Sequence, residues 1–310
     1  MDFDYPAICT NQEGYNHSNL TWQFSRHKHF DPEAGTSGDL MRYFASPNRK
    51  SNVVVSAVGL ANCLTNSTFS ARIRKFLRGA VESNDAVYLI FSFRTFWRYI
   101  ESLYLEQLQA GYLKKSLPAY IEVRLLWFRE FFEQIAELRD IVGENRVLAV
   151  DVDQSDSISA ILALLKIDES KLGARPEILD ARLGLKKAAL LYLYQFGSAG
   201  RKNERTHDQI LRFVHSLDRM ADLPDDIYDY HLIAFEAANR IQEIVRAHIP
   251  DFLSVQLESA SRAVDASHHA ILLDDVVLSI NDVLAIADVL IPVERGRDTR
   301  GPELEQVEAI

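Results

Sequence analysis

Hydrophobic residues occur along this chain in two patterns, short unbroken runs and longer stretches with helical spacing. The unbroken runs are "SNVVVSAVGL" (51–60), "AVYLIFSF" (86–93) and "NRVLAVDVD" (145–153), each of a length typical of a buried strand. A strand that is apolar at every position needs cover on both faces, as in a parallel sheet between helices. We therefore predict three neighbouring parallel strands.

Helical spacing accounts for most of the remaining apolar residues. Residues 68–83, residues 95–110 and the stretch that follows Pro118 each place their apolar side chains on one side. Gly143 is expected just after the last of these helices, because glycine readily adopts the left-handed conformation that ends helices. The order strand, helix, strand, helix, helix, strand indicates an α/β domain with a parallel sheet flanked by helices.

The two ends of the chain differ from this central part. The first fifty residues are polar and are predicted as loops with short helices, and the half after residue 157 is helix-rich. We assign residues 1–265 to the α/β domain and residues 266–310 to a C-terminal extension. Its last stretch, "VERGRDTRGPELEQVEAI", is charged and lacks aromatic residues, so it is expected to be mobile.

Composition narrows the class of protein. The net charge of -10 argues against a nucleic-acid partner, which would select a basic face. Cys9 and Cys63 are the only cysteines, so neither a disulfide framework nor a cysteine zinc site is indicated, and a reducing compartment fits. No apolar run reaches the ~20 residues of a membrane span, and the N-terminus lacks the features of a signal peptide. A cytoplasmic protein is expected; its oligomeric state is not defined by the sequence.

The stretch "YLIFSFRTFWRYIES" is the strongest candidate for a binding site. An apolar strand ends in Arg94, and Ser102 follows eight residues later on the polar side of the next helix. The end of a strand facing the start of a helix is where open α/β sheets bind anions. A guanidinium can bind two phosphate oxygens, and a serine hydroxyl could donate to the same phosphate. On spacing alone, however, a capping arginine and an exposed serine explain the pair better.

Several segments together resemble the sulfotransferase family, in particular bacterial sulfotransferase-like proteins. The segments "VVVSAVGL", "YLIFSFR", "TFWRYIES" and "LYLEQLQAG" follow one another in the family's order and spacing, and "IVGENRV" and "GRKNERTHDQILRFVHSL" are similar to later family segments. The resemblance implies a P-loop NTPase-like fold with 3′-phosphoadenosine 5′-phosphosulfate (PAPS) as co-substrate and no metal. It also implies that Arg94 and Ser102 bind the 3′-phosphate of PAPS. The implied reaction is sulfuryl transfer to a hydroxyl acceptor, expected to be a carbohydrate or another small molecule.

One feature of the sulfotransferase family does not occur in this sequence. The family binds the 5′-phosphosulfate with a glycine- and lysine-containing loop, and no stretch like "GxxKTGT" occurs here. "MDFDYPAI" resembles the part of the family that follows this loop. Two interpretations stay open: a start placed too far downstream, or a non-catalytic nucleotide-binding or scaffold protein that retains the fold. Without the loop we expect little or no transfer, since nothing else here would stabilise charge on the transferring group.

Histidines supply the candidates for proton transfer. Sulfuryl transfer needs a general base near the acceptor, and Glu13 and His17 lie where the acceptor-side loop of the family would fall. We favour His17, although a loop histidine is more often a surface residue. His27 and His29 could suggest a metal, but no third ligand occurs at a recognisable spacing, so no metal site is predicted.

Basic residues give two weaker signals. Arg201 and Lys202 in "SAGRKN" could complete the 3′-phosphate site, and an ordinary solvated loop is an equally good interpretation. A basic run in the helix of residues 68–83 is expected to be a solvated face: Arg72, Arg74, Lys75 and Arg78. A kinase-like phosphoryl transferase is a rival class, but it requires a Walker-type loop that the sequence does not contain.

Overall fold

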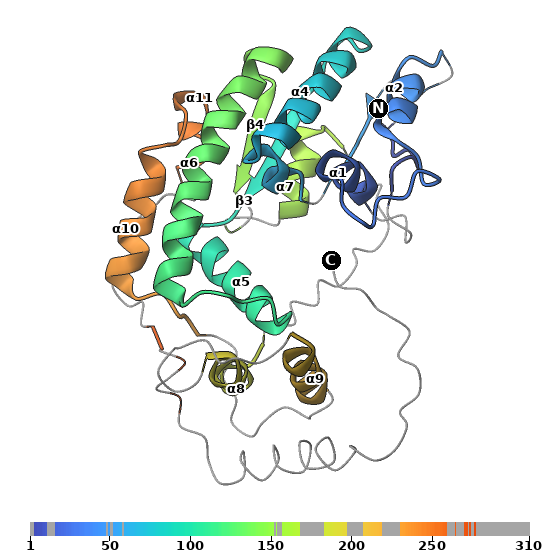
Figure 1. The fold of residues 1–310 in the computed structure, drawn as a ribbon. Coiled ribbons are helices and arrows are strands. Elements are labelled where there is room, and N and C mark those ends of the chain that lie inside the picture. The colour runs from blue at the N-terminus through green and yellow to red at the C-terminus, as the bar shows by residue number, and fades with distance from the viewer. Residues whose placement is uncertain are drawn as a thin grey trace, which may run out of the picture.

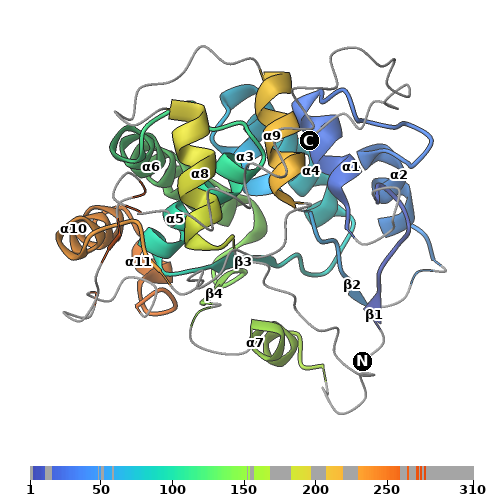
Figure 2. The same cartoon turned by 90° about the horizontal axis from the view of Figure 1, so that it is seen from below.

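The structure is a computed structural model, and it describes residues 3–10, 16–47, 49, 52–57, 59–151, 153, 157–167, 183–196, 207–218, 230–258, 264, 270, 271, 273 and 276. Its elements in chain order are β1 (Phe3–Asp4), α1 (Ser18–Ser25), α2 (Ser37–Phe44), β2 (Asn52–Val53), α3 (Leu60–Leu64), α4 (Ser67–Glu82), β3 (Leu89–Phe93), α5 (Phe96–Gln109), α6 (Leu117–Val142), β4 (Val147–Asp151), α7 (Ser157–Leu164), α8 (Leu185–Phe196), α9 (His207–Asp218), α10 (Phe235–Arg246) and α11 (Asp251–Ser254). Figures 1 and 2 show their arrangement.

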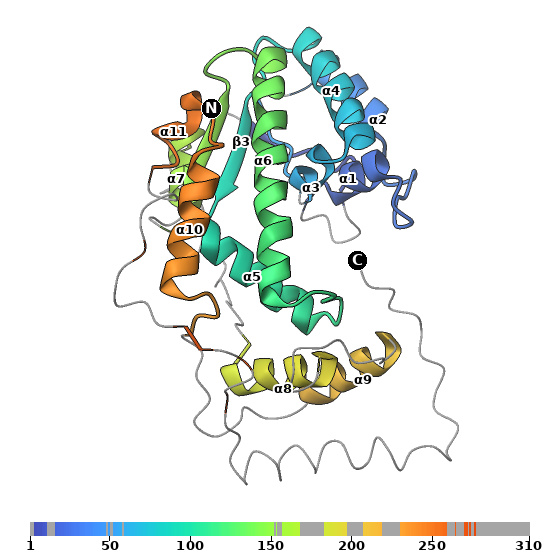
Figure 3. The ribbon, with the colours of Figure 1, turned by 60° about the vertical axis from the view of Figure 1, so that its left-hand side comes forward.

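Two of the three predicted strands form a parallel pair, β3 and β4. Their register runs from Leu89 opposite Val147 to Phe93 opposite Asp151. The long helix α6 packs beside this pair, and α10 and α5 pack against α6 (Figure 3). The predicted α/β arrangement with a small parallel sheet is therefore present, and both strands end at the same edge.

The third predicted strand does not join this pair. In the described part of the chain, β2 bonds to β1 in a separate parallel two-stranded sheet, with Phe3 opposite Asn52 and Asp4 opposite Val53. The N–H of Val54 extends the pairing by donating to the Asp4 carbonyl at 2.9 Å. The prediction of three neighbouring strands was wrong for β2, whose paired strand in the described residues is β1. That segment pairs through only two residues, too few to show a strand pattern.

Aromatic rings join α5 and α6 to β3. The ring of Phe93 stacks on Phe132 of α6 with centroids 5.8 Å apart, and it meets the edge of Phe96, the first residue of α5, at 6.3 Å. Phe96 also contacts Phe128 at 5.2 Å. Phe96, Phe128 and Phe132 are almost fully buried. This cluster fixes where α5 begins relative to the end of β3.

Proline and glycine mark the two ends of α6, and the glycine is the one predicted from the sequence. Pro118 is its second residue, a position that needs no backbone N–H, and Gly143 follows its last residue with φ +102°. A side chain at that φ would be strained, so glycine is required there. The turn at Gly143 sends the chain into β4.

The C-terminal half is helical as expected, and α8 and α9 lie together beside α5 (Figure 3). Tyr194 of α8 stacks on Phe213 of α9 at 3.9 Å, and the Gln195 amide donates to the carbonyl of Leu108 in α5 at 2.7 Å. Four residues of the predicted C-terminal extension are described: Ala270, Ile271, Leu273 and Val276. The Ile271 N–H donates to the His231 carbonyl, and Leu273 is buried. The rest of residues 266–310, including the charged tail, lies outside the described residues.

Candidate functional site

Arg94, one of the predicted anion-binding residues, lies at the carboxyl edge of β3 and β4. Arg94 follows Phe93 directly and is exposed. Thr95 is the N-cap residue of α5, and its side chain makes no capping hydrogen bond. Because the strands are parallel, β4 ends at the same edge of the sheet as β3, and the residues that follow β4 lie there too. The described residue there is Asp153, which is also exposed.

Asp153 makes a contact at this edge that the sequence pattern did not indicate. The N–H of Thr95 donates to Oδ2 of Asp153 at 2.7 Å, across 58 residues of chain. The N–H of Asp153 donates to Oδ1 of Asp151 at 2.9 Å, which holds the turn after β4. A carboxylate favours the start of a helix because unpaired N–H groups and the helix dipole are positive there. The start of α5 therefore attracts an anion, and β4 supplies one from within the chain.

Ser102 lies further along α5 on its exposed face. It is the seventh residue of the helix, roughly 9 Å along the axis from the first. Arg98 precedes it by four residues, so the two share a helical face. The guanidinium of Arg98 lies over the ring of Trp97, 5.3 Å from its centroid. The exposed face of α5 thus carries Arg98, whose guanidinium lies over Trp97, and Ser102 about one turn further along.

His17, the predicted general base, is buried against the backbone. Its side chain is fully buried; Nε2 lies 3.0 Å from the carbonyl of Pro6 and Nδ1 lies 3.2 Å from the N–H of Ser56. Nδ1 lies equally 3.2 Å from the carbonyl of Ser56, so the tautomer of the ring decides which Ser56 group it bonds. Both ring nitrogens contact backbone groups, and the catalytic role of His17 stays a prediction. The imidazole joins the segment before α1 to the segment after β2.

Burial gives His17 a testable effect on stability. Burial lowers its pKa below the usual value, so the unfolded chain takes up the proton at a higher pH than the folded protein. Stability contributed by the neutral ring is lost as pH falls through the ordinary histidine range, about 6.5. We expect the gap in unfolding free energy between wild type and His17→Gln to be larger at pH 7.5 than at pH 5.5. Urea unfolding at both pH values measures it, and parallel pH profiles would contradict the assignment.

The remaining predicted residues divide into two groups. Arg201 and Lys202 lie outside the described residues. His27 and His29 pack against each other and against Trp22, with centroids of the two imidazoles 4.9 Å apart. In the described part of the chain, no three His, Cys, Asp or Glu side chains are placed to share a metal ion.

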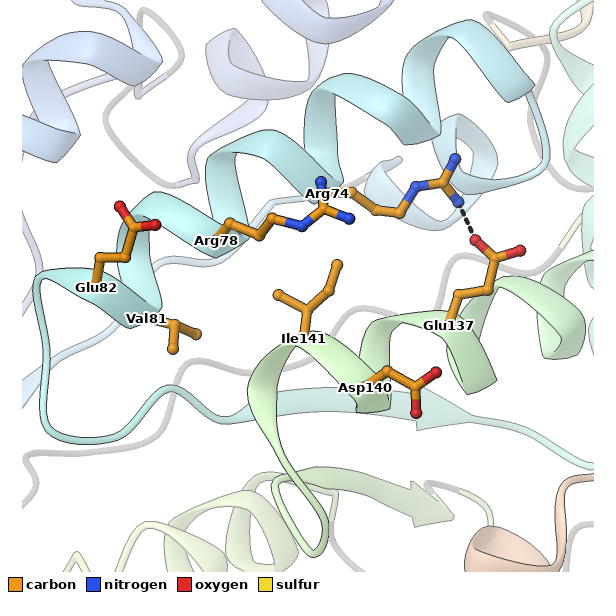
Figure 4. Close-up of a pocket in the computed structure, with 7 residues that line it drawn as sticks. All are labelled: Arg74, Arg78, Val81, Glu82, Glu137, Asp140 and Ile141. Carbon is orange, nitrogen blue, oxygen red and sulfur yellow. Dashed lines mark hydrogen bonds and ion pairs between the residues drawn. The ribbon is translucent and has the colours of Figure 1, made fainter.

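Two residues of the basic run of α4, Arg74 and Arg78, line a groove against α6 (Figure 4). The groove has a volume of about 680 Å³ and is lined by Arg74, Arg78, Val81, Glu82, Glu137, Asp140 and Ile141. Arg74 bonds to Gln134 and pairs with Glu137 on α6, and Arg72 donates to the Phe24 carbonyl at 2.5 Å. The run is therefore only partly a solvated face, because two of its members join helices.

Glu101 is a buried acidic residue that the sequence reasoning missed. Its side chain is 4% exposed on α5; Oε2 accepts from the N–H of Leu232 at 2.9 Å, and Oε1 lies 3.4 Å from Nδ1 of His231. The ring of His231 also meets the edge of Trp97 at 4.9 Å. A signal was available, because Glu101 falls on the apolar side of the helix, four residues after Trp97. Glu101 fixes the segment before α10 against α5.

Comparison of the chain with models of protein families, with curated proteins and with solved structures found no match. Among the described residues, no helix combines the length and the hydropathy needed to cross a membrane.

Proposed function

We propose that the carboxyl edge of β3 and β4 binds an adenosine nucleotide through its 3′-phosphate, as in a PAPS-dependent sulfotransferase-like protein. One observation carries the proposal: an exposed arginine ends a strand of a parallel pair, and the helix that follows presents a serine eight residues later on its exposed face. This is the arrangement that the family resemblance requires of Arg94 and Ser102.

The chemistry of the edge supports an anionic ligand. Arginine binds phosphate through two parallel N–H bonds, and such charge-assisted bonds are stronger than neutral ones. The ligands of open α/β sheets bind outside the carboxyl ends of the strands, where Arg94 lies. The apolar cluster around Phe93 and Phe96 holds the strand end and the helix start together, so the position of Arg94 relative to α5 is fixed before a ligand arrives.

The proposal concerns binding first and transfer second. In a sulfotransferase, a hydroxyl acceptor such as a carbohydrate attacks the sulfur of PAPS, and a base removes its proton. The sequence contains no glycine- and lysine-containing donor loop. His17, the candidate base, is buried against the backbone. The buried His17 favours the alternative function, a non-catalytic cytoplasmic nucleotide-binding or scaffold protein with the same fold.

Arg94→Ala tests the nucleotide site. A hydrogen bond to a charged group contributes roughly 1.5–3 kcal/mol, so the substitution is expected to weaken binding of adenosine 3′,5′-bisphosphate by tens-fold or so. Calorimetric titration of the nucleotide into wild type and variant measures the change. Ser102→Ala is expected to weaken binding less, because it removes a single donor.

Arg98→Ala is the matched control, since Arg98 is an exposed arginine four residues after Arg94 and its guanidinium already lies over Trp97. It is expected to change affinity much less than Arg94→Ala. Equal affinities in all three proteins, with unchanged melting temperatures, would show that Arg94 only ends a strand.

A further inference from the structure

The carboxylate of Asp153 occupies the same environment that the proposed ligand would use. It accepts the Thr95 N–H at 2.7 Å, directly beside Arg94 in the chain and one residue before α5 begins. The first turn of α5 contains no acidic residue of its own. The negative group at the start of α5 therefore comes from another segment of the chain, the turn that follows β4.

A carboxylate and a phosphate compete for such a position. Both accept hydrogen bonds from backbone N–H groups, and both are favoured by the positive end of the helix dipole. Two anions held a few ångströms apart repel each other, so a phosphate at Arg94 binds less tightly while Asp153 stays in place. Asp153 is exposed, and so is its hydrogen bond with the Thr95 N–H.

We propose that Asp153 is an autoinhibitory anion of the nucleotide site, which lowers its affinity for phosphate groups and is displaced or neutralised when a nucleotide binds. This inference rests on the proposed function, because it concerns the same edge and the same Arg94. It predicts that the wild-type protein binds the nucleotide less tightly than Arg94 and the start of α5 would without Asp153.

Asp153→Asn tests the inference, because the amide oxygen can still accept the Thr95 N–H while the charge is removed. Titration of adenosine 3′,5′-bisphosphate is expected to give roughly tenfold tighter binding to Asp153→Asn than to wild type. The gain should disappear in the double variant Arg94→Ala/Asp153→Asn. Asp153→Ser, which keeps an oxygen acceptor without charge, is a second variant in case the first does not fold, and melting curves verify folding of each.

Asp140→Asn controls for the change in net charge. Asp140 is exposed near the end of α6, on the amino-terminal side of β4 and so away from the carboxyl edge. It is expected to bind as wild type does, and a gain equal to that of Asp153→Asn would overturn the inference. Arg94-dependent binding with equal affinity in wild type and Asp153→Asn would overturn the inference alone and leave the proposed function standing. No binding to any variant would overturn both.

Discussion

Phe132→Ala is expected to lower the free energy of unfolding by about 3–5 kcal/mol, the usual range for truncation of a buried phenylalanine. Phe132 is 1% exposed and contacts four other rings of the aromatic cluster. Removal of its ring leaves a cavity between α6 and β3, and the surrounding rings are packed too tightly to fill it. Equilibrium unfolding in urea measures the loss.

Leu126→Ala is the control for this substitution. Leu126 lies on the same helix with 54% of its surface exposed, so its truncation is expected to change stability by no more than about 0.5 kcal/mol. A loss for Phe132→Ala as small as that for Leu126→Ala would mean that the aromatic cluster does not hold α6 to β3. The placement of α5, and with it the candidate site, would then lose its structural basis.

Glu101→Ala is expected to destabilise the protein by about 2–3 kcal/mol. The substitution leaves the buried N–H of Leu232 without its carboxylate acceptor and removes the partner of His231. The range is that of a hydrogen bond to a charged group whose loss leaves a buried N–H unpaired. The segment before α10 should loosen, which faster amide hydrogen exchange at residues 231–233 would report.

Two variants separate the charge from the packing of Glu101. Glu101→Gln keeps an oxygen for the Leu232 N–H and is expected to destabilise less than alanine does. Glu106→Ala, at an exposed position on the same helix, should have little effect. If Glu101→Ala and Glu106→Ala lowered the free energy of unfolding equally little, the buried carboxylate would not be what holds the segment before α10 against α5.

Sequence patterns predicted the elements whose apolar residues are continuous or regularly spaced. The runs that became β3 and β4 are long enough to be recognised, and the expectation of two-sided burial correctly predicted their parallel pairing. The burial itself is only partial, because Leu89, Ile90 and Phe91 of β3 are half-buried and Ser92 is exposed. Gly143 was identifiable because only glycine fits its positive φ without strain. The position of Arg94 at the end of β3 follows from the same apolar run.

Long-range hydrogen bonds could not be predicted in the same way. The pairing of β1 with β2 depends on two residues, and the contact of Asp153 with Thr95 joins positions 58 residues apart. Burial of His17 is set by the chain around Pro6 and Ser56, although its own neighbours in sequence are polar. A polar residue shows no periodic pattern, so its partners depend on the tertiary fold.

The most direct measurement compares two ligands in two proteins. Adenosine 3′,5′-bisphosphate and adenosine 5′-monophosphate differ only in the 3′-phosphate, and each is titrated calorimetrically into wild type and Arg94→Ala. If Arg94 binds the 3′-phosphate, wild type prefers the bisphosphate by tens-fold or so, and the variant loses most of that preference. The same preference in both proteins, or none in wild type, would show that the 3′-phosphate is not bound at the carboxyl edge of β3 and β4.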